Sequence, residues 1–445
     1  MVFIFLILVV VRVVQSYFIL GNSYYELKWL LLGEWLANGF DLYKEAFDYT
    51  GPLAAFVYKY LDLLFGRSFL AHHMINSLVV IIQAGIFNQL LLKNKAYDEN
   101  SYLPALLYTI LIASVPDFMS LSPQLLSLTF VLLAFRNILR RIDNQVTDEL
   151  FLNTGLYIGI ATMIYLPSAV FFLVFLFSLI LFSTAVTRRL LLYFFGFLLV
   201  FALCALYFYW FDSMNFFLDS VLVKGLTIPA GALLTLPQLL IISSPFLFIL
   251  LLSVAKTWSA ARLTNFQQKI QQVIWLMFFG GLSTFFLSKE KSGHELVFMI
   301  PIIAYFWTFY FIHLKRVIFK FLMPGILTFG ILVFSIYAYQ NLLSATKIAG
   351  NANIDQKTMI LGEDLGAYSH IEIATPCFNQ HISKEAFEGL NYYRSSEILF
   401  DLIQRNNPDV IVDELGIQNQ LLYRFPHLEN NYKRTNTNTL VKISN

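Results

Sequence analysis

Charged residues are scarce in this 445-residue chain, since Asp, Glu, Lys and Arg make up 13% of it against 58% hydrophobic residues. A chain with so little charge cannot cover itself with a water-soluble surface. This composition excludes a soluble enzyme and predicts an integral membrane protein. The net charge of +2 supplies no argument for nucleic acid, which we do not expect as a partner.

Several motifs of well-known chemistry are missing. The two cysteines, Cys204 and Cys377, do not make a disulfide framework. The chain has no CxxC pair and no HExxH motif, and the adjacent His72 and His73 would point about 100° apart on a helix, which makes them poor joint metal ligands. It also lacks a phosphate-cradling glycine loop and a Gly-x-Ser-x-Gly elbow. These absences argue against ATP-driven and serine-hydrolase chemistry.

Hydrophobic runs near the ~20 residues that a helix needs to cross a bilayer recur along the chain. About eleven of them lie near 2–20, 69–92, 101–116, 119–136, 150–166, 168–186, 190–210, 234–255, 270–288, 296–313 and 320–340. The first run has no basic start and no small-residue cleavage site, so we interpret it as a transmembrane helix. Within it, either Arg12 snorkels to one interface or the helix begins upstream of the given start. We therefore predict an α-helical polytopic membrane protein with about eleven transmembrane helices.

Lysines and arginines fall in alternate loops, and this sets the predicted orientation. With the N-terminus inside, one register places all the basic loops inside, at Lys93, Arg140, Arg188, Arg262 and Arg316. Residues 21–68, the loop 288–295 and the whole C-terminal tail then lie outside. Because Lys289 and Lys291 sit on that outer side against the rule, loop 288–295 is either a solvated turn or a cationic site for an anionic lipid headgroup.

The hydropathy falls from about residue 343, and the pattern becomes that of a soluble α/β domain. Strands are predicted at 358–362, 409–413 and 439–443, with a helix over 384–404. We therefore predict two domains, 1–342 in the membrane and 343–445 on the outer side. The acidic pairs Glu363-Asp364 and Asp413-Glu414 follow predicted strands, and we interpret them as polar loop ends rather than as a catalytic site.

The first outer loop, 21–68, is too polar to cross a bilayer and too apolar to stand free in water. Aromatic and leucine residues recur there at helical spacing, which predicts short amphipathic helices on the membrane surface. Glu26 and Glu34 are eight residues apart and would face broadly the same side of a helix. Such carboxylates either act on a substrate, as general base or cation ligand, or simply solvate the polar face of an interfacial helix.

Three stretches resemble the GT-C superfamily of membrane glycosyltransferases, which use polyprenyl-phosphate sugar donors. The first outer loop has Glu26 followed by Gly39 and Tyr43, then the run from Asp48 to Leu53 and the end Phe65-Gly66-Arg67-Ser68. The turn Pro116-Asp117 and the break Tyr165-Leu166-Pro167 agree with the same layout. The stretch 288–296, with its Lys289, Lys291 and His294, is similar to the late basic-histidine motif of that superfamily. The resemblance covers about residues 1–340.

This resemblance implies a glycosyltransferase of the bacterial inner membrane that moves a sugar from a polyprenyl-phosphate carrier to an acceptor on the periplasmic face. It implies Glu26 as general base or metal ligand, Glu34 and Asp48 as supporting carboxylates, and Mg²⁺ or Mn²⁺ as the cofactor. It also implies substrate contacts from Tyr43, Trp35, Arg67, Lys289, Lys291 and His294, of which the first two would stack on sugar and the last three would bind donor phosphate. The expected partners are the polyprenyl-phosphate lipid and membrane lipids.

A second hypothesis is a non-catalytic protein of the same fold, a scaffold or assembly factor in a cell-envelope complex for secretion or motility. The missing aspartate, in whose usual place Tyr25 stands, favours it, whereas the Lys289/Lys291/His294 cluster favours the enzyme. Glu295, which follows His294 where a tyrosine is common, is a second departure from the superfamily's pattern. A transporter is less favoured, because the hydrophobic runs hold few ionisable residues beyond Arg12 and show no two similar halves.

Overall fold

The protein divides into two compact units, each described here by itself. The first is drawn from Met1–Gly21, Leu70–Cys204 and Pro229–Thr346, and the second from Asn22–Phe69, Ala205–Ile228 and Lys347–Asn445. The structure, a computed structural model, describes residues 10, 12–13, 24–113, 115–142, 147–182, 187–225, 231–232, 236–260, 263–288, 290–314, 323, 325–326, 329–330, 333–334, 337, 357–362, 365–369, 372–379, 382–383, 393–414, 416–436 and 439–443.

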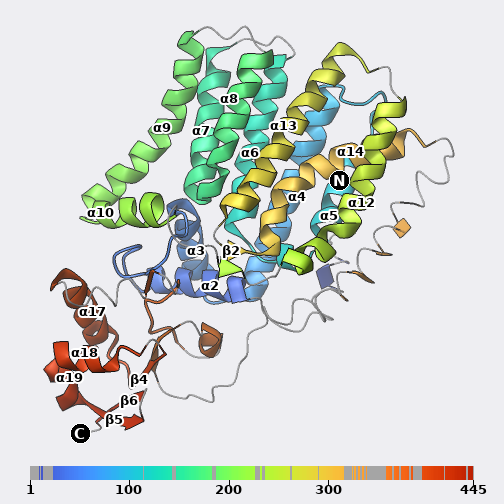
Figure 1. The fold of residues 1–445 in the computed structure, drawn as a ribbon. Helices are drawn as coiled ribbons and strands as arrows, with labels where there is room; N and C mark the ends of the chain where they lie inside the picture. Colours follow the sequence, from blue (N-terminus) through green and yellow to red (C-terminus); the bar gives the residue numbers. More distant parts are fainter. Residues whose placement is uncertain are drawn as a thin grey trace. The chain divides into compact units, whose positions relative to one another are not determined.

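The first unit is a bundle of apolar helices (Figure 1). Among the described residues, four helical segments are long and apolar enough to cross a membrane: α4 (Phe69–Lys93), α9 (Thr187–Trp210), α13 (Asn265–Leu287), and Gly293–Ile312, which joins η4 (Gly293–Met299) to α14 (Ile300–Ile312). Further helices are α5 (Leu103–Ala113), α6 (Pro123–Ile142), α7 (Asp148–Ile164), α8 (Val170–Phe182) and α12 (Leu236–Ala260). These segments bear out a mostly helical membrane protein. The predicted runs 2–20 and 320–340 lie largely outside the described residues.

Local sequence explains how individual helices begin and pack. The hydroxyl of Thr264 accepts the backbone N–H of Gln267 at 3.3 Å, while the Gln267 side chain accepts the backbone N–H of Thr264 at 3.0 Å, and this capping box starts α13. Glycines let α7 and α9 approach closely, because a Cβ atom at Gly155 would lie 2.1 Å from the carbonyl oxygen of Tyr193. The turns η1 (Pro116–Met119) and η2 (Leu166–Ala169) interrupt the bundle at the two proline motifs noted in the sequence.

Arg12 does not reach toward water in this unit. Its side chain is buried and donates hydrogen bonds to the Oδ1 atom of Asn76 at 3.3 Å and to the carbonyl oxygen of Phe118 at 2.9 Å. The amide of Asn76 in turn donates to the carbonyl oxygen of Ser120 at 2.6 Å. Internal hydrogen bonds therefore take the place of snorkelling, one of the two alternatives that the sequence leaves open, because carbonyl and amide oxygens solvate the guanidinium inside the protein.

The second unit combines helices α2 (Tyr24–Ala37) and α3 (Pro52–Phe65) with the end of α9 from Ala205, the segment that follows it, and a C-terminal four-stranded sheet. The sheet order is β3 (Thr358–Leu361), β4 (Val410–Asp413), β6 (Thr439–Lys442), β5 (Tyr432–Asn436). Strands β3 and β4 are parallel, joined through α17 (Tyr393–Asn406), and the other two pairs are antiparallel. The remaining elements are α10 (Met214–Phe217), η3 (Leu218–Lys224), η6 (Leu365–Ser369), α18 (Gln418–Arg424) and α19 (Pro426–Asn431).

This unit divides the chain differently from the boundary at 342/343 that the hydropathy suggests. Residues of the first loop pack with the C-terminal segment, as the backbone N–H of Phe47 donates to the carbonyl oxygen of Pro376 at 2.8 Å and that of Asn379 donates to the carbonyl oxygen of Phe47 at 3.0 Å. Phe47 also belongs to the buried apolar cluster of the sheet. Hydropathy separates membrane from water, but it cannot identify which polar segments pack together, and so it misses this association.

Candidate functional site

Helix α2 is buried on nearly every side, contrary to the expectation of a helix lying on the membrane surface. Eleven of its fourteen residues are buried. The approach to α3 is close, because a Cβ atom at Gly33 would lie 2.6 Å from the carbonyl oxygen of Tyr58, and the rings of Trp29 and Tyr58 stack at 6.1 Å. Helix α3 and the rest of the loop, together with η6, cover α2. In contrast to α2, α3 has an exposed apolar end, at Leu64 and Phe65.

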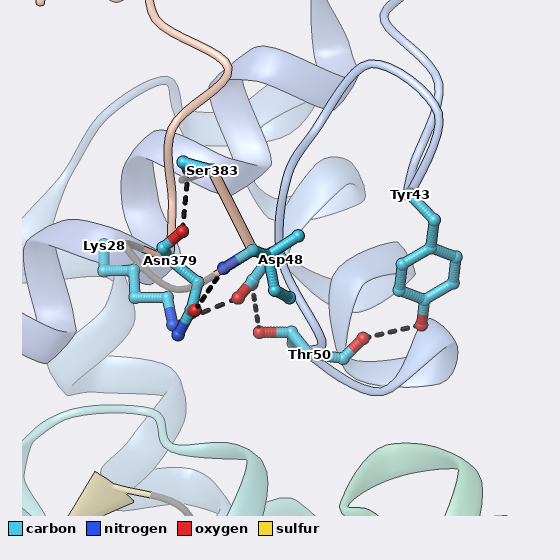
Figure 2. A network of polar contacts seen from close by, with 7 residues as sticks. Lys28, Tyr43, Asp48, Thr50, Asn379 and Ser383 are labelled. Atoms are coloured by element: carbon cyan, nitrogen blue, oxygen red, sulfur yellow. Dashed lines mark hydrogen bonds and ion pairs between the residues drawn. The ribbon is translucent and has the colours of Figure 1, made fainter. Parts of the chain in front are cut away.

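Buried charges gather where α2 meets the loop that follows it. The ammonium of Lys28 lies 3.1 Å from a carboxylate oxygen of Asp48, and both side chains are almost wholly buried. The hydroxyl of Thr50 donates to the other Asp48 oxygen at 2.5 Å, and the Tyr43 hydroxyl donates to the Thr50 carbonyl oxygen at 2.7 Å. Figure 2 shows this network. A buried ion pair with added hydrogen bonds keeps both charges in place.

Glu26 lies near the Lys28–Asp48 ion pair. Its side chain is 4% exposed, so it does not solvate the polar face of an interfacial helix. Burial raises the pKa of Tyr58 well above its ordinary value, and the negative charges of Asp48 and Glu26 raise that pKa further. Glu26, Asp48 and Tyr58 are therefore close enough to interact electrostatically, and the Tyr58 phenol stays protonated. We name Glu26, Lys28, Asp48 and Tyr58 the α2 charge cluster.

Glu34 lies outside this cluster and is held by a different partner. Both oxygens of its carboxylate accept from Arg67, at 2.6 Å from Nε and 2.8 Å from Nη2. Arg67 also donates to the carbonyl oxygen of Tyr368 in η6. The pKa of nearby Asp62 is raised, first by burial and then by the charge of Glu34, while Arg67 opposes the rise. The structure thus brings Glu34 and Arg67 together as a bidentate pair that joins the loop to the C-terminal segment.

The two aromatic residues expected to stack on sugar are buried. Trp35 stacks on Phe40 with ring centroids 3.9 Å apart, and its Nε1 donates to the carbonyl oxygen of Glu45 at 3.0 Å. Tyr43 has a positive φ of 67° and is 3% exposed. A sugar-stacking role for Trp35 and Tyr43 stays a prediction, and their rings now pack in the protein interior.

Sequence reasoning missed one further polar connection in this unit. The carboxylate of Glu45 accepts from Arg405 in α17 at 2.5 Å and from the backbone N–H of Asp41 at 2.8 Å. The Arg405 guanidinium also lies 4.8 Å from the centre of the Phe40 ring. Nothing in the local pattern around Glu45 could have identified a partner 360 residues away.

The late basic-histidine motif lies in the first unit. Both ring nitrogens of the buried His294 contact hydroxyls, with Nε2 at 2.8 Å from Ser120 and Nδ1 at 3.2 Å from Ser292. Lys289 lies outside the described residues. Lys291 lies in the short strand β2 (Glu290–Lys291), which pairs in parallel with β1 (Gly231–Ala232). The histidine is therefore held rigidly, and the structure leaves the phosphate-binding role of the two lysines as a prediction.

Neighbouring carboxylates also hold this motif in place. Glu295 accepts from Ser288 at 2.7 Å, from Gln124 at 2.9 Å and from the Tyr165 hydroxyl at 2.5 Å. Asp117, from the proline turn η1, accepts the backbone N–H of Gly293 at 3.0 Å. The Pro-Asp turn, the Tyr-Leu-Pro break and the basic-histidine stretch, which are far apart in sequence, therefore meet in one polar network.

The α2 charge cluster does not fit a divalent cation. A metal bound there would have to share Asp48 with the Lys28 ammonium, which already lies 3.1 Å from that carboxylate and would repel a second cation. Among the described residues, no three His, Cys, Asp or Glu side chains are grouped so that they could hold a metal ion. We derive no step of the reaction through a metal.

Comparison with known proteins rests on structure alone, because no family model and no curated protein matches the sequence. ArnT from Cupriavidus metallidurans bound to undecaprenyl phosphate is 11% identical, with a TM-score of 0.58 over 98% of this chain and 97% of that chain. The oligosaccharyltransferase AglB from Archaeoglobus fulgidus, in complex with an inhibitory peptide and a dolichol-phosphate, is 11% identical, with a TM-score of 0.48 over 100% and 74%. A structure of the Archaeoglobus fulgidus oligosaccharyltransferase with Zn and sulfate is 10% identical, with a TM-score of 0.48 over 98% and 72%.

These neighbours are polyprenyl-phosphate-dependent membrane glycosyltransferases of the GT-C superfamily. The ArnT match extends over nearly the whole of both chains, so it describes the complete architecture rather than one shared helical hairpin. At 11% identity the likeness concerns the fold. The chain therefore has an ArnT-like fold, in agreement with the resemblance that the motifs of its first outer loop carry.

Proposed function

We propose that the protein is a glycosyltransferase that moves a sugar from a polyprenyl-phosphate carrier to an acceptor on the periplasmic face of the bacterial inner membrane. The observation that carries this proposal is the ArnT-like fold along 98% of the chain, in a comparison structure bound to undecaprenyl phosphate. The buried carboxylate of Glu26, on a loop helix rather than in a lipid-facing span, supplies the candidate reactive group.

In the proposed reaction the acceptor's nucleophilic atom attacks the anomeric carbon of the carrier-bound sugar. A bond forms between that atom and the carbon, and the bond from the carbon to the phosphate oxygen breaks. The electron pair leaves with the polyprenyl phosphate, and the acceptor's proton passes to the carboxylate of Glu26, which acts as general base. No oxidant, reductant or metal is needed for this balance.

The neighbouring groups have positioning and charge roles in this proposal. Lys28 and Asp48 hold each other at 3.1 Å and keep a fixed pair of charges beside Glu26. Glu34 and Arg67 hold the loop against η6 through the bidentate pair. Lys289 and Lys291 would bind the donor phosphate by charge, while His294, held by two serine hydroxyls, would orient the loop that carries them.

Mass spectrometry of lipids retained during gentle detergent purification tests the proposal without knowledge of the acceptor. We expect wild type to retain a polyprenyl phosphate and its sugar-bearing form, and Lys289→Ala/Lys291→Ala to lose both. Lys93→Ala/Lys95→Ala, a pair of lysines from another loop, is the matched control. Only bulk phospholipids in every sample, identical across the variants, would overturn the proposal.

The role of Glu26 has its own readout in the same samples. Glu26→Gln keeps the shape of the side chain and removes the base, so transfer should slow by about 10²- to 10⁴-fold. The retained carrier should then shift toward the sugar-bearing form, because donor still binds but is not consumed. A Glu26→Gln protein with the wild-type ratio of loaded to free carrier, and full transfer, would show that another group is the base.

The non-catalytic scaffold is a second candidate, and two observations favour it. Glu34 and Asp48, the expected supporting carboxylates, are each paired with a cation, and the rings of Trp35 and Tyr43 are buried. In a scaffold, such buried contacts would serve only to hold the structure of the first loop. Copurification of a protein partner at fixed stoichiometry, together with the absence of any polyprenyl lipid, would support this candidate over the enzyme.

A further inference from the structure

A pocket of the second unit lies apart from the α2 charge cluster. Its walls come from residues 36–42 at the end of α2, from residues 56–59 on α3, and from residues 207–213 at the end of α9 and beyond. It has about 390 Å³ of empty space, including space open to solvent. The cavity volume within it is about 40 Å³, a few times what one water molecule needs, so the pocket suits one compact group rather than a large ligand.

Aromatic rings form half of the lining, contributed by Phe40, Phe56, Tyr207, Phe208 and Phe211. The ring of Phe56 meets that of Tyr207 edge-on, with centroids 5.0 Å apart, and Tyr207 lies 4.8 Å from Phe211. Tyr207 and Phe211 are 42% and 51% exposed. These rings therefore pack against one another and still expose surface that a ligand can contact. Trp35 and Tyr43, for which the resemblance implies sugar stacking, are by contrast buried.

Two side chains of opposite charge complete the lining, Asp41 and Lys59. Both are half-buried, and neither forms an ion pair within the part of the chain that the structure describes. Asp41 is held in place through its backbone N–H, which donates to Glu45, itself bound by Arg405. A fixed carboxylate and an ammonium on an aromatic pocket supply directional polar contacts without a net charge.

The pocket adjoins the end of a helix that is long and apolar enough to cross a membrane, α9. Next to its lining residues on that helix, Tyr209 and Trp210 are 72% and 82% exposed. Exposed tyrosine and tryptophan at the end of a span are typical of the membrane–water interface. A ligand here would have its polar group at the interface and an apolar chain in the bilayer.

We infer that this pocket binds the pyranose ring of a neutral membrane-borne glycoside. The apolar face of the ring would pack on the aromatic side chains, while its hydroxyls donate to Asp41 and accept from Lys59. An anionic donor phosphate fits less well, because the two lining charges sum to zero. The inference rests on the proposed function and identifies the pocket as the place of the acceptor sugar.

Binding of short alkyl glycosides tests the inference on the full chain in phosphatidylglycerol nanodiscs, which contain neither a glycoside nor a zwitterionic lipid. The probes share one chain and differ in headgroup: octyl glucoside, octyl galactoside and octyl mannoside, against octylphosphocholine and octanol. Saturation-transfer NMR reads the headgroup protons, with empty nanodiscs subtracted. At least one pyranoside should bind more tightly than octanol and octylphosphocholine.

Variants link that binding to the pocket. Asp41→Asn should weaken the preferred pyranoside by at least about tenfold, because a hydrogen bond to a charged group is lost, and Tyr207→Ala should weaken it similarly. The controls Asp212→Asn and Tyr209→Ala, both exposed and outside the lining, should bind as wild type does.

Three results would overturn the inference: octanol binding equal to every pyranoside, tighter binding of octylphosphocholine, or unchanged binding in Asp41→Asn. The proposed function fails separately, on the absence of the carrier lipid from purified wild type. If the pocket binds a glycoside but purified wild type holds no carrier lipid, the protein is a glycoside-binding membrane protein and the proposed function is refuted. Carrier without glycoside binding would refute the pocket alone.

Discussion

Lys28 offers the sharpest perturbation of the loop, because its ammonium is the cation that the structure places against the buried carboxylate of Asp48. Lys28→Met keeps the length and the apolar part of the side chain and removes the charge. The Asp48 carboxylate then remains buried beside Glu26 without its cation. Breaking a buried pair by removing one partner costs about 3–5 kcal/mol, since the remaining charge pays its desolvation without compensation.

The size of the effect makes it measurable in detergent. At about 2–4 °C per kcal/mol for a cooperative unit of 150–250 residues, the loss corresponds to an apparent Tm lower by roughly 6–20 °C. Size-exclusion chromatography with fluorescence detection after brief heating, at one fixed heating time, gives this Tm even where unfolding is irreversible. Lys44→Met, a half-buried lysine of the same loop, is the matched control and should change the unfolding free energy by less than about 0.5 kcal/mol.

The double variant Lys28→Met/Asp48→Asn completes a thermodynamic cycle. Removing both charges should restore most of the lost stability, because no uncompensated charge is then buried. If Lys28→Met alone melts with wild type, the pair does not stabilise the loop. If the double variant is as unstable as the sum of the two single variants, the residues act independently, and the charge-pair reasoning is wrong.

Two further predictions concern packing and the buried thiol. Gly33→Ala should lower the unfolding free energy by about 1–3 kcal/mol, because its Cβ would lie 2.6 Å from the Tyr58 carbonyl oxygen. Leu64→Ala, on the exposed end of α3, is the control and should have little effect. Equal Tm values for the two variants would contradict the close approach of α2 and α3. Burial raises the pKa of Cys377 to about 11, so iodoacetamide at pH 8 should label it only after unfolding, as read by mass spectrometry, and rapid labelling of the folded protein would refute this. The buried thiol must lose its proton less readily than in the unfolded chain, so its contribution to stability is present below pH 9 and is lost as the pH rises toward 11.

The membrane helices were the predictable part of this structure. The apolar runs 69–92 and 190–210 correspond to α4 (Phe69–Lys93) and α9 (Thr187–Trp210), because a bilayer selects segments by length and apolarity alone. The strands at 358–362, 409–413 and 439–443 also match β3, β4 and β6 closely. Alternating or continuous apolar residues between turn signals report such strands locally. The polar β5, with its Lys433 and Arg434, carries no such signal and was missed.

The pairing of charges could not be predicted. The first loop contains nine Asp, Glu and Lys residues between Glu26 and Asp62, and no local rule selects Lys28 as the partner of Asp48. The spacing of Glu34 and Glu26 predicts that they share one side of a helix, but in the folded protein Glu34 pairs with Arg67. The burial of α2 has the same origin, because its cover comes from α3, the loop and η6, and not from the helix's own pattern.

The make-up of the second unit has a consequence for biosynthesis. Phe47 leaves the ribosome 330 residues before Cys377, the residue whose segment it joins by a backbone bridge. At about 5–20 residues per second, roughly 15–65 s pass before that partner exists. During this time the first loop lacks the C-terminal segment with which Phe47 pairs, while the helices between them insert one by one. The C-terminal segment therefore completes the second unit late in synthesis, and a chain truncated before residue 372 would leave the first loop accessible to proteases.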